Sequence, residues 1–337
     1  MHTSEAPMTP TPLQALQPGQ VSHLTEPRDL RPAWHRWSQR EIDAITLALA
    51  AQRPLLLRGE PGSGKTQLAR AAANVLGWRL HTAVIHARYE ASDLFYRFDA
   101  VRRLADAHAR RLEDLLPDED HYLSPGPLWQ ALDWTGAKKM LKETQDPPGH
   151  VLLLDEIDKA DADLANALLD ALGSRSFRHP FRQKAVGGEI NAFPLVLITT
   201  NEDRELPPAF LRRCLVLDMD AAAQADYAAL LFLIGEAHFG ALPERPRRLA
   251  QDLIQEVART VNEDRQKLAD ALFQPPGVAE FIDLLTALED LAPGLDAAAQ
   301  EKQTALLKKL ADYALRKHAG RELPAHLRQG ADQTAQA

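Results

Sequence analysis

The chain has 337 residues, 45% of them hydrophobic and 26% charged, so we expect a globular protein with more than one domain. The formal net charge of −8 argues against nucleic acid as a general partner, and no stretch approaches the ~20 apolar residues of a membrane span. The single cysteine, Cys214, excludes an internal disulfide and, with no signal-peptide pattern at the start, predicts a cytoplasmic protein.

The first predicted elements lie between residues 1 and 58. Residues 1–33 are rich in Pro, Thr, Gln and Ser and lack sustained periodicity, so we expect a flexible N-terminal arm. Ser38 followed by Glu41 is a capping-box pattern, which predicts a helix from Ser38 to about residue 51. The apolar run at 55–58 predicts the first strand of a core domain that we place at residues 34–219.

A glycine-rich segment follows this strand and fits the phosphate-binding pattern G-x-x-x-x-G-K-[ST] at every fixed position. It opens into a predicted helix at 66–76, and a strand, a glycine turn and a helix start are the context that this pattern requires. Lys65 would reach the β- and γ-phosphates of a nucleoside triphosphate, and the Thr66 hydroxyl would bind Mg²⁺. The candidate nucleotide-binding residues are Gly59, Glu60, Pro61, Gly62, Ser63, Gly64, Lys65, Thr66 and Gln67.

A second strand is predicted at 80–86, and the chain then makes a long excursion at 87–150. A connection of this length indicates an insertion with elements of its own. It contains a helical pattern at 93–116, dense in Arg, Asp and Ala, and another at 128–134. We interpret the arginines of 93–116 as solvated helix charges that pair with neighbouring carboxylates.

The wholly apolar run at 151–154 predicts a buried strand that ends in two carboxylates, Asp155 and Glu156. Asp155 would hold Mg²⁺ directly or through water, and Glu156 would be the base that polarises the attacking water. The alternative for Glu156 is a solvated carboxylate at a helix start.

Further strands are predicted at 195–199 and 214–217, after a helix at 161–172 and a hairpin within 175–193. Strands that alternate with helices predict an α/β fold, an open parallel sheet with helices on both faces. From 220 to about 318 the pattern is almost entirely helical, so we expect a small helical lid domain there, followed by a disordered tail at 319–337.

Polar residues at two places after the strand that ends in Asp155 and Glu156 are further candidate site residues. The amide of Asn201, at the tip of a predicted strand, could lie between the γ-phosphate and water, or it could cap a turn. Arg212 and Arg213 could be solubility charges, or one of them could be an arginine finger that enters the site of a neighbouring subunit.

These motifs, in this order, resemble the AAA+ ATPases and, within them, the MoxR-like branch of the dynein-related type. The resemblance spans roughly residues 34–290. It depends most on the phosphate-binding segment 59–66, the sequence Asp-Glu-Ile-Asp-Lys-Ala at 155–160, the Gly-Pro-Leu turn at 126–128, and the segments 167–172, 200–201 and 206–213.

The resemblance implies roles for the later candidates. Asn201 would be the sensor-1 residue, and Arg213 the trans-acting finger, with Arg212 as the alternative because it takes the place of an Asp in the family pattern. The branch often has a sensor-2 arginine in its lid, but no arginine occurs at 274–280, so Arg265 or Lys267 would have to supply that charge.

The resemblance also implies a function. The chain would be a Mg²⁺-dependent ATPase that assembles as a homo-oligomeric ring, most simply a hexamer, and remodels a protein client with a von Willebrand A-domain partner. The alternative is a slowly hydrolysing, nucleotide-gated scaffold or signalling switch, which the missing sensor-2 arginine favours. A DNA-acting motor is a third alternative, and the acidic net charge argues against it.

Overall fold

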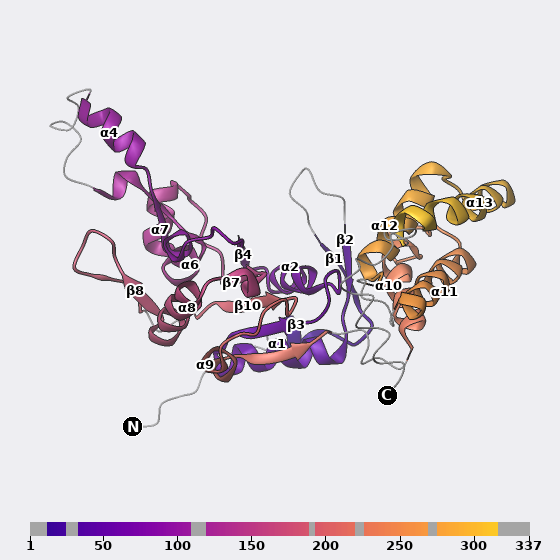
Figure 1. Cartoon of the computed structure of the whole chain (residues 1–337), viewed down its shortest axis with the longest axis horizontal. Helices are drawn as coiled ribbons and strands as arrows, with labels where there is room; N and C mark the ends of the chain where they lie inside the picture. The colour runs from indigo at the N-terminus through magenta and orange to yellow at the C-terminus, as the bar shows by residue number, and fades with distance from the viewer. Residues whose placement is uncertain are drawn as a thin grey trace, which may run out of the picture. The chain divides into compact units, whose positions relative to one another are not determined.

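The structure is a computed structural model that describes residues 12–24, 33–108, 119–188, 193–219, 226–268 and 275–315. The chain forms two compact units, which divide between residues 224 and 225, and each is described by itself (Figure 1). Within the described ranges, no helix combines the length and the apolar composition needed to cross a membrane. The predicted domain boundaries at 219 and 318 lie beside or within segments outside the description and stay predictions.

The first unit is built on a parallel five-stranded sheet with the order β11-β3-β10-β7-β4. This is the predicted α/β fold. Strand β4 follows β3 in the chain, but in the sheet β10 and β7 lie between them. The carboxyl ends of β3, β10 and β7 are therefore neighbours at one edge of the sheet. The strands are β3 (Leu55–Arg58), β4 (Arg79–Val84), β7 (His150–Asp155), β10 (Leu195–Thr200) and β11 (Leu215–Asp218).

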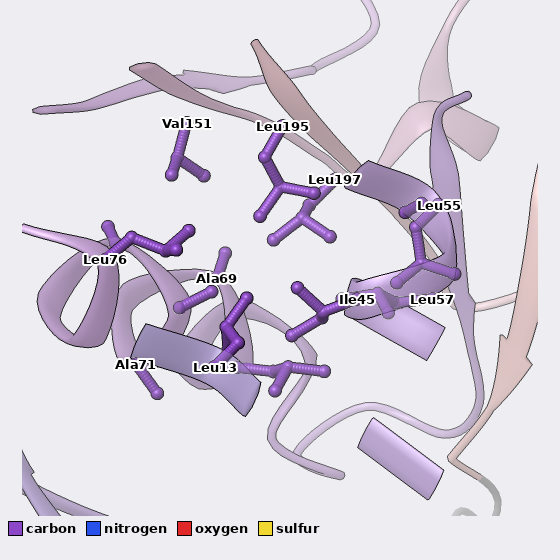
Figure 2. Close-up of a cluster of buried hydrophobic side chains, with 14 of the residues drawn as sticks. Leu13, Ile45, Leu55, Leu57, Ala69, Ala71, Leu76, Val151, Leu195 and Leu197 are labelled. Atoms are coloured by element: carbon purple, nitrogen blue, oxygen red, sulfur yellow. The ribbon is translucent and has the colours of Figure 1, made fainter. Parts of the chain in front are cut away.

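Apolar side chains alternate between the two faces of this sheet, as the period of a β-strand requires. On one face, α1 (Gln39–Ala51) and α2 (Lys65–Leu76) contribute to a cluster with the strands, and Figure 2 shows Ile45 and Ala69 directed toward Leu197. On the other face, α8 (Ala162–Ser174) contributes to a second cluster with Leu152, Leu154, Val196 and Ile198. Both faces are therefore covered, as predicted.

The N-terminal arm differs from the prediction. Residues 12–24 form a 3₁₀ turn, η1 (Pro12–Ala15), and strand β1 (Val21–Leu24), which pairs antiparallel with β2 (Ala33–Arg36). Leu13 and Leu24 are buried in the cluster with α1 and α2. The predicted flexible arm at 1–33 is therefore wrong for residues 12–24, because a few leucines in a polar context are enough to anchor it. Residues 1–11 and 25–32 lie outside the description.

The insertion between β4 and β7 contains more elements than predicted. The single helix predicted at 93–116 is wrong, because β5 interrupts it and pairs antiparallel with β6 from later in the chain. Residues 109–116 of that prediction lie outside the description. The elements are α3 (Ala91–Phe95), β5 (Tyr96–Phe98), α4 (Ala100–His108), η2 (Glu119–Tyr122), β6 (Leu123–Pro125), α6 (Pro127–Leu132) and α7 (Trp134–Leu141).

The hairpin predicted within 175–193 is confirmed. Strands β8 (Ser176–Arg178) and β9 (Ala185–Gly187) pair antiparallel, and residues 179–184 connect them. The structure also describes η3 (Ile157–Lys159), directly after β7, and α9 (Pro208–Arg213), directly before β11.

The regular elements of the second unit are helices throughout its described residues, as predicted, and one isolated bridge joins Leu242 and Arg245 in the connection after the first of them. Two of its helices begin at an aspartate, Asp226 or Asp296, whose side chain accepts a hydrogen bond from the first turn. The helices are α10 (Tyr227–Phe239), α11 (Gln251–Leu268), α12 (Val278–Leu291) and α13 (Ala297–Ala314). The predicted tail at 319–337 lies outside the description.

Candidate functional site

The phosphate-binding segment connects the end of β3 to the start of α2. Gly59, Gly62 and Gly64 have φ angles of 145°, 79° and 95°, a region that glycine adopts without the steric cost of a Cβ. Gly64 is the N-cap of α2, and no side chain caps that helix end. The backbone N–H groups of the first turn, and the positive end of the helix dipole, are therefore available to an anion.

Lys65 lies inside this loop and is buried. Its ammonium group donates to the carbonyl oxygens of Gly59 and Glu60, both at 2.7 Å, and lies 3.5 Å from the Ser63 hydroxyl. Burial lowers the pKa of Lys65, and the charge of Asp155 acts against that shift. Lys65 is thus held within the loop, where the charge of Asp155, at the end of β7, acts on it.

Gln67, the last of the predicted nucleotide-binding residues, has its side chain directed elsewhere. Its amide nitrogen donates to the carbonyl oxygen of Trp34, in β2, at 2.6 Å. Its backbone still belongs to the first turn of α2, so its N–H group remains part of the predicted anion site.

Thr66 and Asp155, the two predicted metal ligands, lie next to each other. The Thr66 hydroxyl is 3.1 Å from each of the two carboxylate oxygens of Asp155, although the residues are 89 positions apart in the chain. Hydroxyl and carboxylate oxygens are ligands that Mg²⁺ prefers. Among the residues that the structure describes, no group of three or more His, Cys, Asp or Glu could hold a metal by itself. The pair therefore fits an ion that takes its other ligands from water and from a bound phosphate.

Thr199, which the sequence analysis did not select, connects the two acidic residues. Its buried hydroxyl donates to a carboxylate oxygen of Asp155 at 2.6 Å and accepts from the Glu156 N–H at 2.8 Å. The register of β10 on β7 pairs Ile198 with Leu154, which places the next residue of each strand side by side. The sequence gives no sign that Thr199 contacts the acidic residues, because it looks like any other residue at the end of a strand. The register of the two strands is what identifies it.

Glu156, the predicted base, leaves the path of β7 at a left-handed backbone position with φ of 62°. Such a conformation costs a non-glycine residue roughly 1 kcal/mol and marks a local constraint. Its carboxylate is one-third exposed and pairs with Lys159 at 2.6 Å, which raises the pKa of Lys159. Although Glu156 occupies the N-cap position of η3, its side chain makes no capping bond, which weighs against the alternative of a helix-start carboxylate.

Asn201 directly follows β10, at the same edge of the sheet as Asp155 and Glu156. Its backbone N–H donates to the carboxylate of Asp158 at 3.2 Å, and its side-chain amide forms no hydrogen bond with the part of the chain that the structure describes. The amide therefore does not cap the turn, which weighs against that alternative.

Arg212 and Arg213 end the short helix α9, and both side chains are exposed. Their carbonyl oxygens accept hydrogen bonds from Arg53 at 2.6 and 3.3 Å, so the backbone of this segment is fixed to the end of α1. Neither guanidinium forms an ion pair within the described ranges. The contacts of Arg212 and Arg213 therefore do not indicate which of the two is the better candidate for the arginine finger.

The two candidates for a replacement of the sensor-2 arginine belong to the second unit and make contacts there. Arg265 donates to the carbonyl oxygen of Pro276 at 3.2 Å and lies 4.8 Å from the ring centre of Tyr227. Lys267 pairs with Asp264 at 3.1 Å.

Residues 54–214, slightly less than half of the chain, match the family model of the AAA domain, dynein-related subfamily. No curated protein matches the chain significantly. Among solved structures, the chain is similar to the RuvB Holliday junction branch migration motor of Thermotoga maritima, at 16% identity and a TM-score of 0.44, over 80% of this chain and 69% of that one. It is also similar to a proposed ATPase of Cytophaga hutchinsonii, at 15% identity and a TM-score of 0.38, over 74% of this chain and 68% of that one.

Because both TM-scores lie below 0.5, neither structure says what this chain binds or does. The family match is different, because its residues run from β3, before the phosphate-binding segment, through α9 and include Lys65, Thr66, Asp155 and Glu156. Over residues 54–214, the first unit of this chain is therefore similar to the AAA domain of the dynein-related subfamily.

Proposed function

We propose that this chain binds ATP with Mg²⁺ and hydrolyses it to ADP and phosphate, as a member of the MoxR-like branch of the AAA+ ATPases. The observation that carries the proposal is the meeting of Thr66 and Asp155 at 3.1 Å, next in the chain to the buried Lys65, on which the charge of Asp155 acts. A helix start, a lysine and a strand-end carboxylate, brought together from distant parts of the chain, are the parts that bind a metal-bound triphosphate.

Each part has a separate role in this proposal. The glycine backbone and the start of α2 bind phosphate oxygens, and Lys65 places a positive charge at the β- and γ-phosphates. Thr66 and Asp155 would hold Mg²⁺, which when bound offsets the negative charge of the phosphates. Thr199 fixes the carboxylate of Asp155 in the orientation that this requires.

Glu156 is the proposed base, because its carboxylate follows the metal-binding position and remains partly exposed. It would accept a proton from the water that attacks the γ-phosphorus, as the bond to the leaving ADP oxygen breaks. The contact with Lys159 holds the carboxylate near the edge of the sheet. Asn201, with an amide that no described residue engages, would orient the same water.

The experiment that tests the proposal is the substitution Glu156→Gln, which retains the size of the side chain and removes the base. We expect the variant to bind ATP as the wild type does, measured with a fluorescent ATP analogue, and to lose nearly all phosphate release. Glu205→Gln is the matched control, because Glu205 is an exposed carboxylate of the same unit, and its rate should equal that of the wild type. Wild-type rates in Glu156→Gln would reject this residue as the base.

We further propose that the chain acts as a homo-oligomeric ring, most simply a hexamer, in which Arg213 or Arg212 of one copy completes the site of the next. The exposure of both side chains, without an ion pair to the described residues of their own copy, supports this. The mass of the purified protein should increase to that of a ring when ATP and Mg²⁺ are added. A monomer under all nucleotide conditions would contradict it.

The finer proposal is that the ring remodels a protein partner, of the kind that carries a von Willebrand A domain. The alternative is a slow nucleotide-gated switch, which the contacts of Arg265 and Lys267 within the second unit favour. The two differ in turnover. Glu156→Gln, which should retain bound ATP, is the form in which to capture the partner. Stimulation of wild-type hydrolysis by that partner would support the remodeller, whereas nucleotide-dependent binding without stimulation would support the switch.

A further inference from the structure

A buried carboxylate lies behind the proposed site and has no role in the chemistry described so far. Asp158 is in η3, two residues after Glu156, and is only 2% exposed. A carboxylate loses much of its hydration when it is buried, so it needs hydrogen bonds in return. The partners that it has in this structure are therefore informative.

Those partners are backbone groups of one turn. One oxygen of Asp158 accepts from the N–H of Asn201 at 3.2 Å and from the N–H of Asp203 at 3.1 Å. The N–H between them, that of Glu202, donates to the Thr200 hydroxyl at 2.9 Å. Three consecutive peptide groups after β10 are thus fixed by side chains, two of them by Asp158.

The same turn has a second attachment, to the strand that leads into the phosphate-binding segment. Arg58, which directly precedes Gly59, pairs with the carboxylate of Glu202 at 2.9 Å. Glu202 has a left-handed backbone, with φ of 63°, so the turn is held in a conformation that it would not adopt freely. The turn is therefore attached on one side to η3, directly after β7, and on the other to β3.

We propose that Asp158 is a positioning residue, which holds the 201–203 turn so that the amide of Asn201 lies at the phosphate edge of the sheet. The inference rests on the proposed function. The electrostatic influence of Asp158 on buried Lys65 supports it, because it shows that this carboxylate lies near the phosphate-binding segment. The second oxygen of Asp158 is buried without a hydrogen bond to the described residues, so the carboxylate makes its contacts through the turn.

This role predicts how substitutions combine. Asp158→Ala should lower kcat by ~10–100-fold, the range in which a small misplacement affects catalysis, while the affinity for the fluorescent ATP analogue stays within about threefold. Asp158→Asn keeps an oxygen that can accept from the turn, so it should recover most of the rate. Asp163→Ala, a change at an exposed aspartate five residues later, is the control and should leave kcat unchanged.

A double-mutant cycle makes the test specific. If Asp158 acts through Asn201, then Asn201→Ala should lower kcat by itself, and adding Asp158→Ala should lower it little further. Multiplying losses, an unchanged kcat in Asp158→Ala, or an equal loss of nucleotide affinity would overturn the inference. If Asp158→Ala does not fold, the cycle is measured with Asp158→Ser, which also removes the carboxylate.

The failure of this inference can be told from the failure of the proposed function. Wild-type protein that hydrolyses ATP but gives multiplying losses in the cycle rejects only the role of Asp158. Wild-type protein that neither binds nor hydrolyses ATP rejects the proposed function, and the role of Asp158 with it.

Discussion

Thr199→Val tests whether the contact between β10 and β7 stabilises the site as the geometry indicates. Valine has nearly the shape of threonine but no hydroxyl, so the substitution removes two hydrogen bonds and little else. One is the bond to the Asp155 carboxylate at 2.6 Å, and the other is the bond that pairs the N–H of Glu156 at 2.8 Å. Because Thr199 is 1% exposed, water cannot readily replace the lost hydroxyl.

The magnitude follows from these two bonds. A hydrogen bond to a charged group contributes about 1.5–3 kcal/mol, and a peptide N–H left without a partner costs about 1–3 kcal/mol. The additional buried methyl group returns about 0.8 kcal/mol. We therefore expect Thr199→Val to lower the free energy of unfolding of the first unit by about 2–5 kcal/mol.

The assay is urea unfolding followed by tryptophan fluorescence. All five tryptophans of the chain belong to the first unit, so the signal reports on that unit alone. Thr82→Val is the matched control, because Thr82 is an exposed residue of β4 in the same sheet, and a surface change of this kind alters stability by less than about 0.5 kcal/mol. If Thr199→Val is as stable as Thr82→Val, the two bonds do not stabilise the site and the reasoning is refuted.

Two further predictions concern the finger and pH. Arg213→Ala should retain nucleotide affinity and lower turnover by ~1000-fold in the assembled protein. The same loss in Arg212→Ala alone would identify Arg212 as the finger. An unchanged turnover in both variants would exclude both residues. Burial lowers the pKa of His81 to about 3 and that of His150 to about 4, against about 6.5 in an unfolded chain. The unfolded state therefore binds more protons between about pH 4 and pH 6.5, so stability should rise with pH across that window and level off above it. Urea unfolding at about pH 5 and about pH 7.5 measures this change in stability. In a double His81→Gln, His150→Gln variant, the difference in the free energy of unfolding between the two pH values should be smaller. A difference equal to that of the wild type would contradict the assignment to these histidines.

Sequence alone was sufficient where the information is local. The phosphate-binding residues around Lys65 are contiguous, and glycine at both fixed positions of the pattern allows the backbone angles that the loop needs. The alternation of apolar strands with amphipathic helices predicted the parallel sheet for the same reason, because each element carries its own period. The capping box of Ser38 and Glu41 is also local, and the structure contains it with both of its hydrogen bonds.

Tertiary structure decided the features that depend on register or on a few distant contacts. Thr199 and Thr200 are both threonines at the end of β10, but it is the Thr199 hydroxyl that contacts Asp155, and no sequence period gives the alignment of β10 with β7. Asp158 contacts a turn more than 40 residues away, which its neighbours in the chain do not indicate. The burial of Leu13 and the interruption of a helical pattern by β5 have the same origin, since packing partners elsewhere in the chain outweigh weak local preferences.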